Sequence, residues 1–223
     1  PGYHAANFNM ADISLYSKEM GGVPAGNAPV DTPDPTSIIS SGQGFAVKAA
    51  SAGITATFNN AMRVTGPNDT YRRPITSERD RLWINVYNDS YGLGSTTLIG
   101  FSENTVDGYE ANADIKRLAT PVSIYSELAS GQELAINALA SFEIEASVGL
   151  SFSTQVKESQ NYRISLQDVD GINLETVNVF LIDNQLGTMT NLTEGDYTFQ
   201  SEEGTYSERF KVVFQEQILG TNN

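Results

Sequence analysis

The chain has 223 residues, of which 39% are hydrophobic and only 18% are charged, with no cysteine and a single histidine. Its 27 acidic and 13 basic side chains give a formal net charge of −14, which favours solubility or an affinity for divalent cations and disfavours nucleic acid and anionic membranes as partners. The absence of cysteine excludes disulfides, thiolate metal sites and thiol catalysis, and the lone His4 excludes catalytic histidine pairs and argues against a Ser-His-Asp triad.

The first 37 residues are predicted to form an extended segment or linker. Prolines and glycines are dense over residues 21–35, and each proline pushes the residue before it into an extended conformation. Only residues 12–16 alternate as a strand does. We expect Pro1 to lie within a longer precursor, and we expect no membrane-spanning segment, because no apolar run reaches the roughly 18 residues that a membrane helix needs.

Residues 38–218 are predicted to form one main domain, an all-β antiparallel sandwich of jelly-roll or immunoglobulin-like type, followed by a linker over residues 219–223. Polar and apolar residues alternate with the period of two that places one face of a strand against a core. Residues 82–87 are apolar on both faces, which predicts a central strand. Residues 109–116 are expected to form at most one or two helical turns. Strands are expected at residues 45–49, 54–58, 82–87, 97–101, 123–126, 133–137, 147–152, 161–166, 177–182, 196–199 and 209–214.

Several short stretches recur in the order in which a known family has them. They are residues 41–49 (SGQGFAVKA), 58–63 (FNNAMR), 81–86 (RLWINV), 98–101 (LIGF), 162–166 (YRISL), 179–183 (VFLID) and the stretch 197–210. Together, over about residues 38–215, they resemble the C-terminal β-domain region that precedes the sorting domain in Bacteroidetes proteins exported by the type IX secretion system. The chain differs in having Phe45 and Ala46 where that family commonly has two aromatic residues.

This resemblance implies an extracellular or cell-surface location. Since no nucleophile and base are recognisable as a pair, we expect no enzyme. We predict a non-catalytic structural or binding module of a secreted or surface protein with a role such as adhesion, whose partners are other domains of its precursor or cell-surface proteins. The alternative is a carbohydrate-binding module of a secreted glycan-degrading enzyme, with a polysaccharide as its partner. No cofactor is expected apart from a calcium ion.

The candidate calcium ligands are Asp168, Asp170 and Asn173. They supply oxygens at alternating positions, and Gly171 follows the second aspartate, as at the start of a calcium loop. The segment lacks the glycine and the final glutamate of a helix-loop-helix site. A plain β-turn, for which Asp-Gly is a strong signal, is the alternative.

Two further groups of residues are candidates for work on sugars. Glu143 and Glu145 have the i, i+2 spacing that puts two carboxylates on one strand face, which fits either a solvated face or the acid pair of a glycosidase. Exposed aromatic rings bind sugars by stacking, and Tyr87 and Tyr91 border a predicted turn where they can do so. Trp83 lies in the strongest strand, and we expect it in the core rather than on a binding platform.

Overall fold

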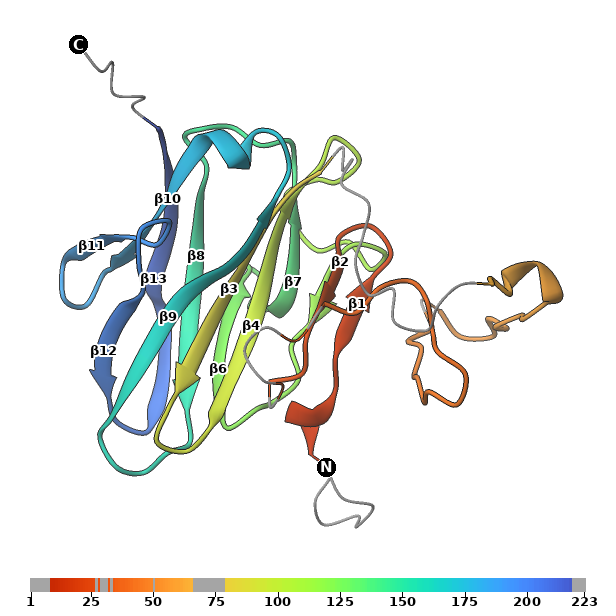
Figure 1. Cartoon of the computed structure of the whole chain (residues 1–223), viewed down its shortest axis with the longest axis horizontal. Helices are drawn as coiled ribbons and strands as arrows, with labels where there is room; N and C mark the ends of the chain where they lie inside the picture. The colour runs from red at the N-terminus through yellow and green to blue at the C-terminus, as the bar shows by residue number, and fades with distance from the viewer. Residues whose placement is uncertain are drawn as a thin grey trace.

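The computed structural model describes residues 9–26, 28, 32, 34–49, 51–65 and 79–217. In this part of the chain nearly all regular structure is β, and the strands form a sandwich (Figure 1). The all-β sandwich expected from the sequence is therefore confirmed. None of the described helices is long and apolar enough to cross a membrane. His4 and the linker expected at residues 219–223 lie outside the described residues.

The sandwich comes from one continuous path of paired strands, β11-β10-β13-β8-β6-β7-β4-β3-β9-β12, with β5 also paired to β7. The path bends between β6 and β7, which share only two residue pairs, so its two halves face each other. Every pairing is antiparallel except that of β4 with β7, which is parallel. The strands are β3 (Asp80–Asn88), β4 (Leu93–Phe101), β5 (Ile115–Lys116), β6 (Val122–Glu127), β7 (Glu133–Leu139), β8 (Ser147–Thr154), β9 (Gln160–Asp170), β10 (Val177–Asp183), β11 (Thr188–Asn191), β12 (Tyr197–Ser201) and β13 (Gly204–Glu216).

The core lies between the two halves and is built by the alternation seen in the sequence. In β3, Leu82, Ile84 and Val86 point inward and are fully buried. β3 is paired to β4 on one side and to β9 on the other, so the prediction of a central strand is confirmed. Phe199 and Phe210 meet edge to face in the core with ring centres 5.0 Å apart.

A short N-terminal hairpin, β1 (Leu15–Ser17) and β2 (Gly21–Val23), packs on the outer face of β3, β4 and β7. This strand pair overlaps the alternation expected at residues 12–16. Trp83 is buried beneath the hairpin, 3% exposed, and its indole nitrogen donates a hydrogen bond of 2.8 Å to the carbonyl oxygen of Gly22. The prediction that Trp83 belongs to the core is confirmed, although its core is a second, smaller one outside the sandwich.

The prediction of strands at residues 45–49 and 54–58 is wrong. These stretches have no strand partner among the described residues, and their side chains are exposed. The first strand of the sandwich begins instead at Asp80. Alternation shows that a segment is suited to a strand, but a strand forms only where a neighbouring edge accepts its backbone hydrogen bonds. At residues 109–116, where at most one or two helical turns are expected, one turn is closed by a hydrogen bond of 2.7 Å from the Asp114 backbone to the Glu110 carbonyl oxygen, and β5 follows it.

Candidate functional site

A hollow of about 240 Å³ opens on the outer face of β3 and β9, beside the segment that follows β2. Polar side chains dominate its floor, because the outward positions of the central strands carry them. The hollow is lined by Pro24, Ala25, Gly26, Ala28, Asn85, Tyr87, Thr96, Arg163, Ser165, Leu166, Gln167 and Asp196. Its volume is just below the roughly 300 Å³ at which pockets for drug-sized ligands begin, so it suits a ligand about as large as one sugar ring.

Strand register places the polar groups of the floor in one row. Asn85 of β3 lies opposite Thr96 of β4 and opposite Ser165 of β9. The side-chain amide of Asn85 donates to the Thr96 hydroxyl at 3.1 Å, and that hydroxyl donates to Gln167 at 3.1 Å. Gln167 reaches the row because the β3–β9 register shifts beside it, at the step from Trp83 to Ile84. The linked amides and hydroxyl hold fixed donors and acceptors toward the hollow.

Tyr87 and Arg163 form the next row and make the hollow partly aromatic. They are direct cross-strand partners, and both are half-buried. The Arg163 guanidinium binds Asp196 at 2.9 Å and lies 3.7 Å from Asp89. These two carboxylates raise the pKa of Arg163, chiefly through the hydrogen bond with Asp196. Arg163, the one cation among the described lining residues, is thus already matched by two carboxylates.

Two glycines bring the N-terminal segment down onto the sheet to form a wall of the hollow. Gly26 lies directly over Gly94 of β4, and a Cβ atom at Gly26 would overlap the Gly94 carbonyl oxygen. A Cβ at Gly94 would in turn overlap the Tyr87 ring and the Val86 carbonyl. Any larger side chain at either glycine would lift the segment or displace Tyr87, so this wall depends on both.

The two tyrosines proposed as ligand-binding residues are placed differently. Tyr87 lines the hollow, whereas Tyr91 stands on the β3–β4 turn, 51% exposed, and does not line it. The remaining polar lining residues were missed by sequence reasoning, because they come from three strands and from the loop before β12, which only the fold brings together. The outward positions of the central strand 82–87 were the one available signal.

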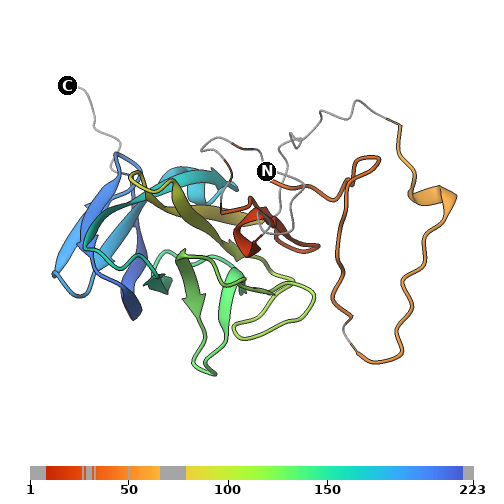
Figure 2. The same ribbon diagram turned by 90° about the horizontal axis from the view of Figure 1, so that it is seen from below.

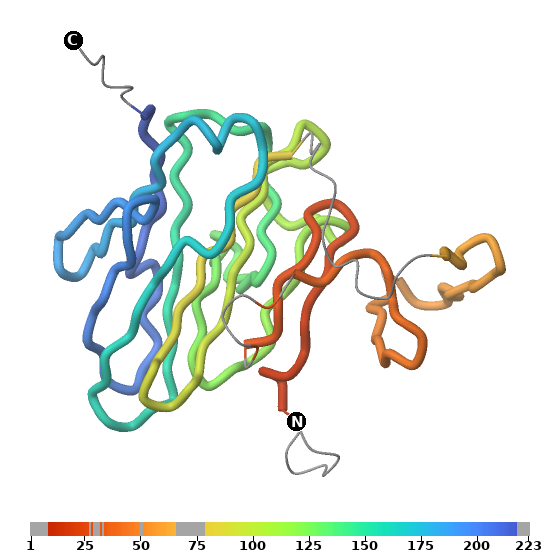
Figure 3. Tube along the Cα trace, in the orientation of Figure 1, coloured from red at the N-terminus to blue at the C-terminus, as the bar shows by residue number. Residues whose placement is uncertain are grey.

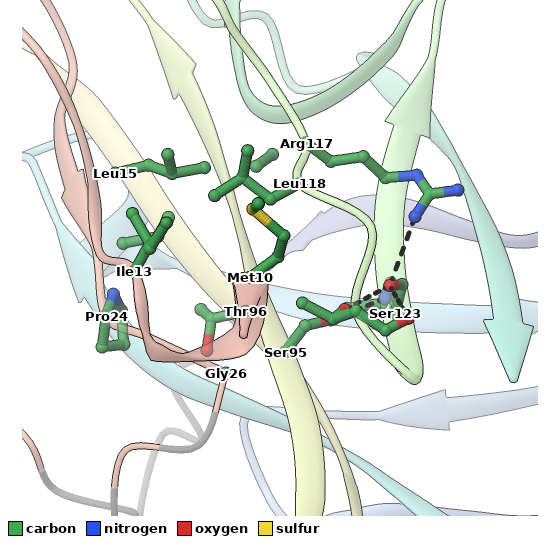
Figure 4. A pocket seen from close by; sticks show the side chains of 14 residues that line it. Met10, Ile13, Leu15, Pro24, Gly26, Ser95, Thr96, Arg117, Leu118 and Ser123 are labelled. Carbon is green, nitrogen blue, oxygen red and sulfur yellow. Dashed lines mark hydrogen bonds between the residues drawn. The ribbon is translucent and has the colours of Figure 1, made fainter. Parts of the chain in front are cut away.

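A second, narrower gap lies under residues 10–26, beside β4 and β6 (Figure 4). Met10, Ile13 and Leu118 point into it, and Arg117 reaches toward Ser123 at its rim. Its volume is about 30 Å³, room for about two water molecules, so it is a packing gap rather than a ligand site.

The candidate calcium ligands lie at the end of β9 and just beyond it. Asp170 forms an ion pair with Arg81, and the Asn173 side chain donates to Asp80 at 2.7 Å. Asp168 accepts a hydrogen bond of 2.9 Å from the backbone of the next residue. The fold therefore uses Asp170 and Asn173 in contacts with β3. Among the described residues, no three acidic or histidine side chains are grouped as a metal site requires.

Asp34 places a buried carboxyl group near the start of this segment. Burial, and next the charge of Asp168, raise the pKa of Asp34 to about 7, while Arg81 lowers it. Its Oδ1 atom is buried and has no hydrogen-bond partner among the described residues. A protonated Asp34 is the form that this environment favours.

The spacing of Glu143 and Glu145 predicts that their carboxylates share a strand face, and this prediction is wrong. They lie in the turn before β8, and both are exposed. The chain leaves the sheet at this turn, so the i, i+2 spacing has no strand to act on. Neither residue lines the β3–β9 hollow.

A family model described as a domain of unknown function, DUF8693, matches residues 1–214. The match covers the sandwich, the N-terminal hairpin and the intervening segment. No curated protein and no solved structure matches the chain.

Proposed function

The chain belongs to this family of unknown function, and we propose that it is a non-catalytic extracellular module that binds a carbohydrate in the β3–β9 hollow. The observation that carries the proposal is the combination of an aromatic ring, Tyr87, with a row of amide and hydroxyl groups in a hollow the size of one sugar ring. Sugars present apolar ring faces for stacking and hydroxyls that both donate and accept hydrogen bonds, and such a surface matches both.

The charge of the hollow favours a neutral sugar over an acidic one. Arg163 is already engaged by Asp196 and Asp89, and the chain carries a formal net charge of −14. A uronic acid or a sulfated sugar would meet this excess of negative charge, and the described lining residues offer no cation that is not already paired. A neutral hexose or pentose unit within a polysaccharide meets no such repulsion.

The proposed extracellular location and type IX export depend on the resemblance of residues 38–215 to the type IX secretion family. The proposed lack of catalysis depends on the arrangement of acidic residues at the hollow. The acidic residue that lines the hollow is Asp196, which is held by Arg163. Hydrolysis of a glycosidic bond needs two carboxyl groups facing each other across the substrate. We therefore expect binding without turnover.

The test is a calorimetric titration of the purified chain with cellohexaose, xylohexaose, mannohexaose and laminarihexaose, and with oligogalacturonate as the acidic probe. We expect at least one neutral oligosaccharide to bind and to be recovered uncleaved, and oligogalacturonate not to bind. Tyr87→Ala should abolish the heat of binding, and Asn85→Ala should weaken it, since the two remove stacking and a hydrogen-bonding group respectively.

Tyr91→Ala is the matched control, because it removes a tyrosine from the same turn region without touching the hollow. It should bind as the parent does. The proposal fails if no neutral oligosaccharide binds, or if binding survives in Tyr87→Ala and disappears in Tyr91→Ala.

A further inference from the structure

The two stretches wrongly expected as strands belong to an arm, residues 36–49 and 51–65, that extends away from the sandwich (Figures 2 and 3). From residue 41 onward its described residues are all exposed. Exposed large apolar side chains gather on it: Ile38, Ile39, Phe45, Val47, Ile54, Phe58, Met62 and Val64. Phe45 and Phe58 contact each other edge to face at 5.8 Å, and this is the aromatic contact of the arm. So many exposed apolar groups on one segment indicate a surface that is covered in use.

The arm keeps the alternation of a strand although it lacks a partner among the described residues. Phe45 and Val47 fall on one side and Ala46 and Lys48 on the other, and residues 54–58 repeat the pattern. An extended chain of this kind is stabilised when it adds its backbone to the open edge of a sheet. The arm therefore needs an edge strand with a complementary surface.

β12 offers such an edge. Within the described residues it pairs only with β9 and ends the strand path of the sandwich. It is five residues long, and its side chains alternate as those of the arm do, with Phe199 buried and Thr198 and Gln200 exposed. A strand laid beside it would place Phe45 and Val47 next to the core side and Lys48 on the outer side.

Charge favours the same match. The arm holds two basic residues, Lys48 and Arg63, and no acidic residue. Because the whole chain has a formal net charge of −14, the chain without the arm has a formal net charge of −16. The ends of β12 are acidic and exposed, with Glu194 and Asp196 before it and Glu202 and Glu203 after it. A basic, apolar strand beside an acidic edge is complementary in both charge and pattern.

We propose that the arm of one copy of this chain adds to the β12 edge of a second copy, so that the module assembles with itself. Both halves of the contact are present in one chain, and among the described residues neither is paired with another strand on its free side. The arm is separate from the proposed sugar site, because Phe45, Val47 and Lys48 do not line the β3–β9 hollow, and the β12 edge shares Asp196 with that hollow.

The first test measures the mass of the purified chain by sedimentation over a range of concentrations. The mass should rise above that of one copy as concentration increases, and high salt should oppose the rise because the contact is partly electrostatic. Val47→Asp, Ala46→Pro and Lys48→Glu should each weaken association about tenfold or more, since they remove an apolar contact, a backbone donor and a charge match. Combining Lys48→Glu with Glu203→Lys should restore part of the loss.

Ala52→Pro is the matched control, because it lies in the turn between the two stretches and should leave association unchanged. All arm variants should unfold at the temperature of the parent, since the arm is exposed. A chain that stays a single copy at every concentration, or one that associates equally well with Val47→Asp, overturns the proposal.

The second test identifies the edge, and the absence of cysteine from the parent makes it clean. A chain with Ala46→Cys is mixed with a chain with Gln200→Cys and oxidised, and we expect a disulfide between the two. Met189→Cys, on the opposite edge strand β11, replaces Gln200→Cys in the control mixture and should give little product. Preferential crosslinking to Met189→Cys, or of Ala46→Cys chains with each other, would overturn the assignment to β12.

Discussion

Replacing Asp183 with asparagine should destabilise the sandwich strongly, because this residue is one half of a buried ion pair. The side chains of Asp183 and Arg209 are 0% and 3% exposed, and Asp183 accepts from Arg209 at 3.0 and 3.2 Å. Tyr197 donates a further hydrogen bond to it at 2.9 Å. Burial by itself would raise the pKa of Asp183, but the bonds from Arg209 and Tyr197 lower it below the usual 3.8.

The size of the effect follows from what remains after the change. Asp183→Asn keeps the shape of the side chain but leaves the Arg209 charge buried without a counter-charge. Removing one partner of a buried pair costs about 3–5 kcal/mol, and we expect about 3 because asparagine still offers one acceptor oxygen. The matched control is Asp196→Asn, which breaks the more exposed pair with Arg163 and should cost at most about 1 kcal/mol.

Urea unfolding followed by the fluorescence of the single, buried Trp83 measures both variants on one probe. For Asp183→Asn the midpoint should fall by roughly 1 M urea or more, given a slope of about 2–3 kcal/mol/M. Since the pKa of Asp183 is lowered in the folded state, its stabilising effect is complete above pH 3.8 and is lost as the pH falls through the folded-state pKa. Equal midpoints for Asp183→Asn and Asp196→Asn at neutral pH would refute this reasoning.

Three further predictions concern the N-terminal hairpin and the segment at the end of β9. Trp83→Ala should lower the free energy of unfolding by about 3–5 kcal/mol in circular dichroism melts, because it removes a large buried aromatic side chain and the hydrogen bond to Gly22. An unchanged melting curve would contradict the packing of the hairpin on Trp83. Because the pKa of Asp34 is raised to about 7, the contribution of Asp34 to stability is full below pH 3.8 and is lost as the pH rises through 7. Asp34→Asn should therefore raise the melting temperature at pH 8 and flatten the pH dependence of the melting temperature between pH 3.8 and 7. A variant that is less stable than the parent at pH 8 would count against this prediction. Millimolar calcium should leave the melting temperature of the parent unchanged, because Asp170 is held by Arg81. A rise in melting temperature that Asp168→Asn abolishes would instead establish a calcium site at the end of β9.

The sequence alone predicted the sandwich because alternation is a local property. Each inward residue of β3 could be read from its neighbours two positions away, and the same reading placed Trp83 in a core. It also found Tyr87, since an aromatic residue next to a turn is visible without any partner. It could not show that Tyr87 would line the hollow and that Tyr91 would not.

What only the tertiary structure decided is how segments distant in the chain pair and pack. Residues 54–58 and residues 161–166 both alternate in the sequence, yet the first stretch is exposed and the second is paired on both sides, because strand formation depends on an edge that another part of the chain must supply. The meeting of Asn85, Thr96 and Gln167 has no local signal, since it is set by the register of three strands and a shift between two of them. Local chemistry thus determined which segments suit strands and which faces are apolar, while non-local pairing determined which strands exist and where the β3–β9 hollow lies.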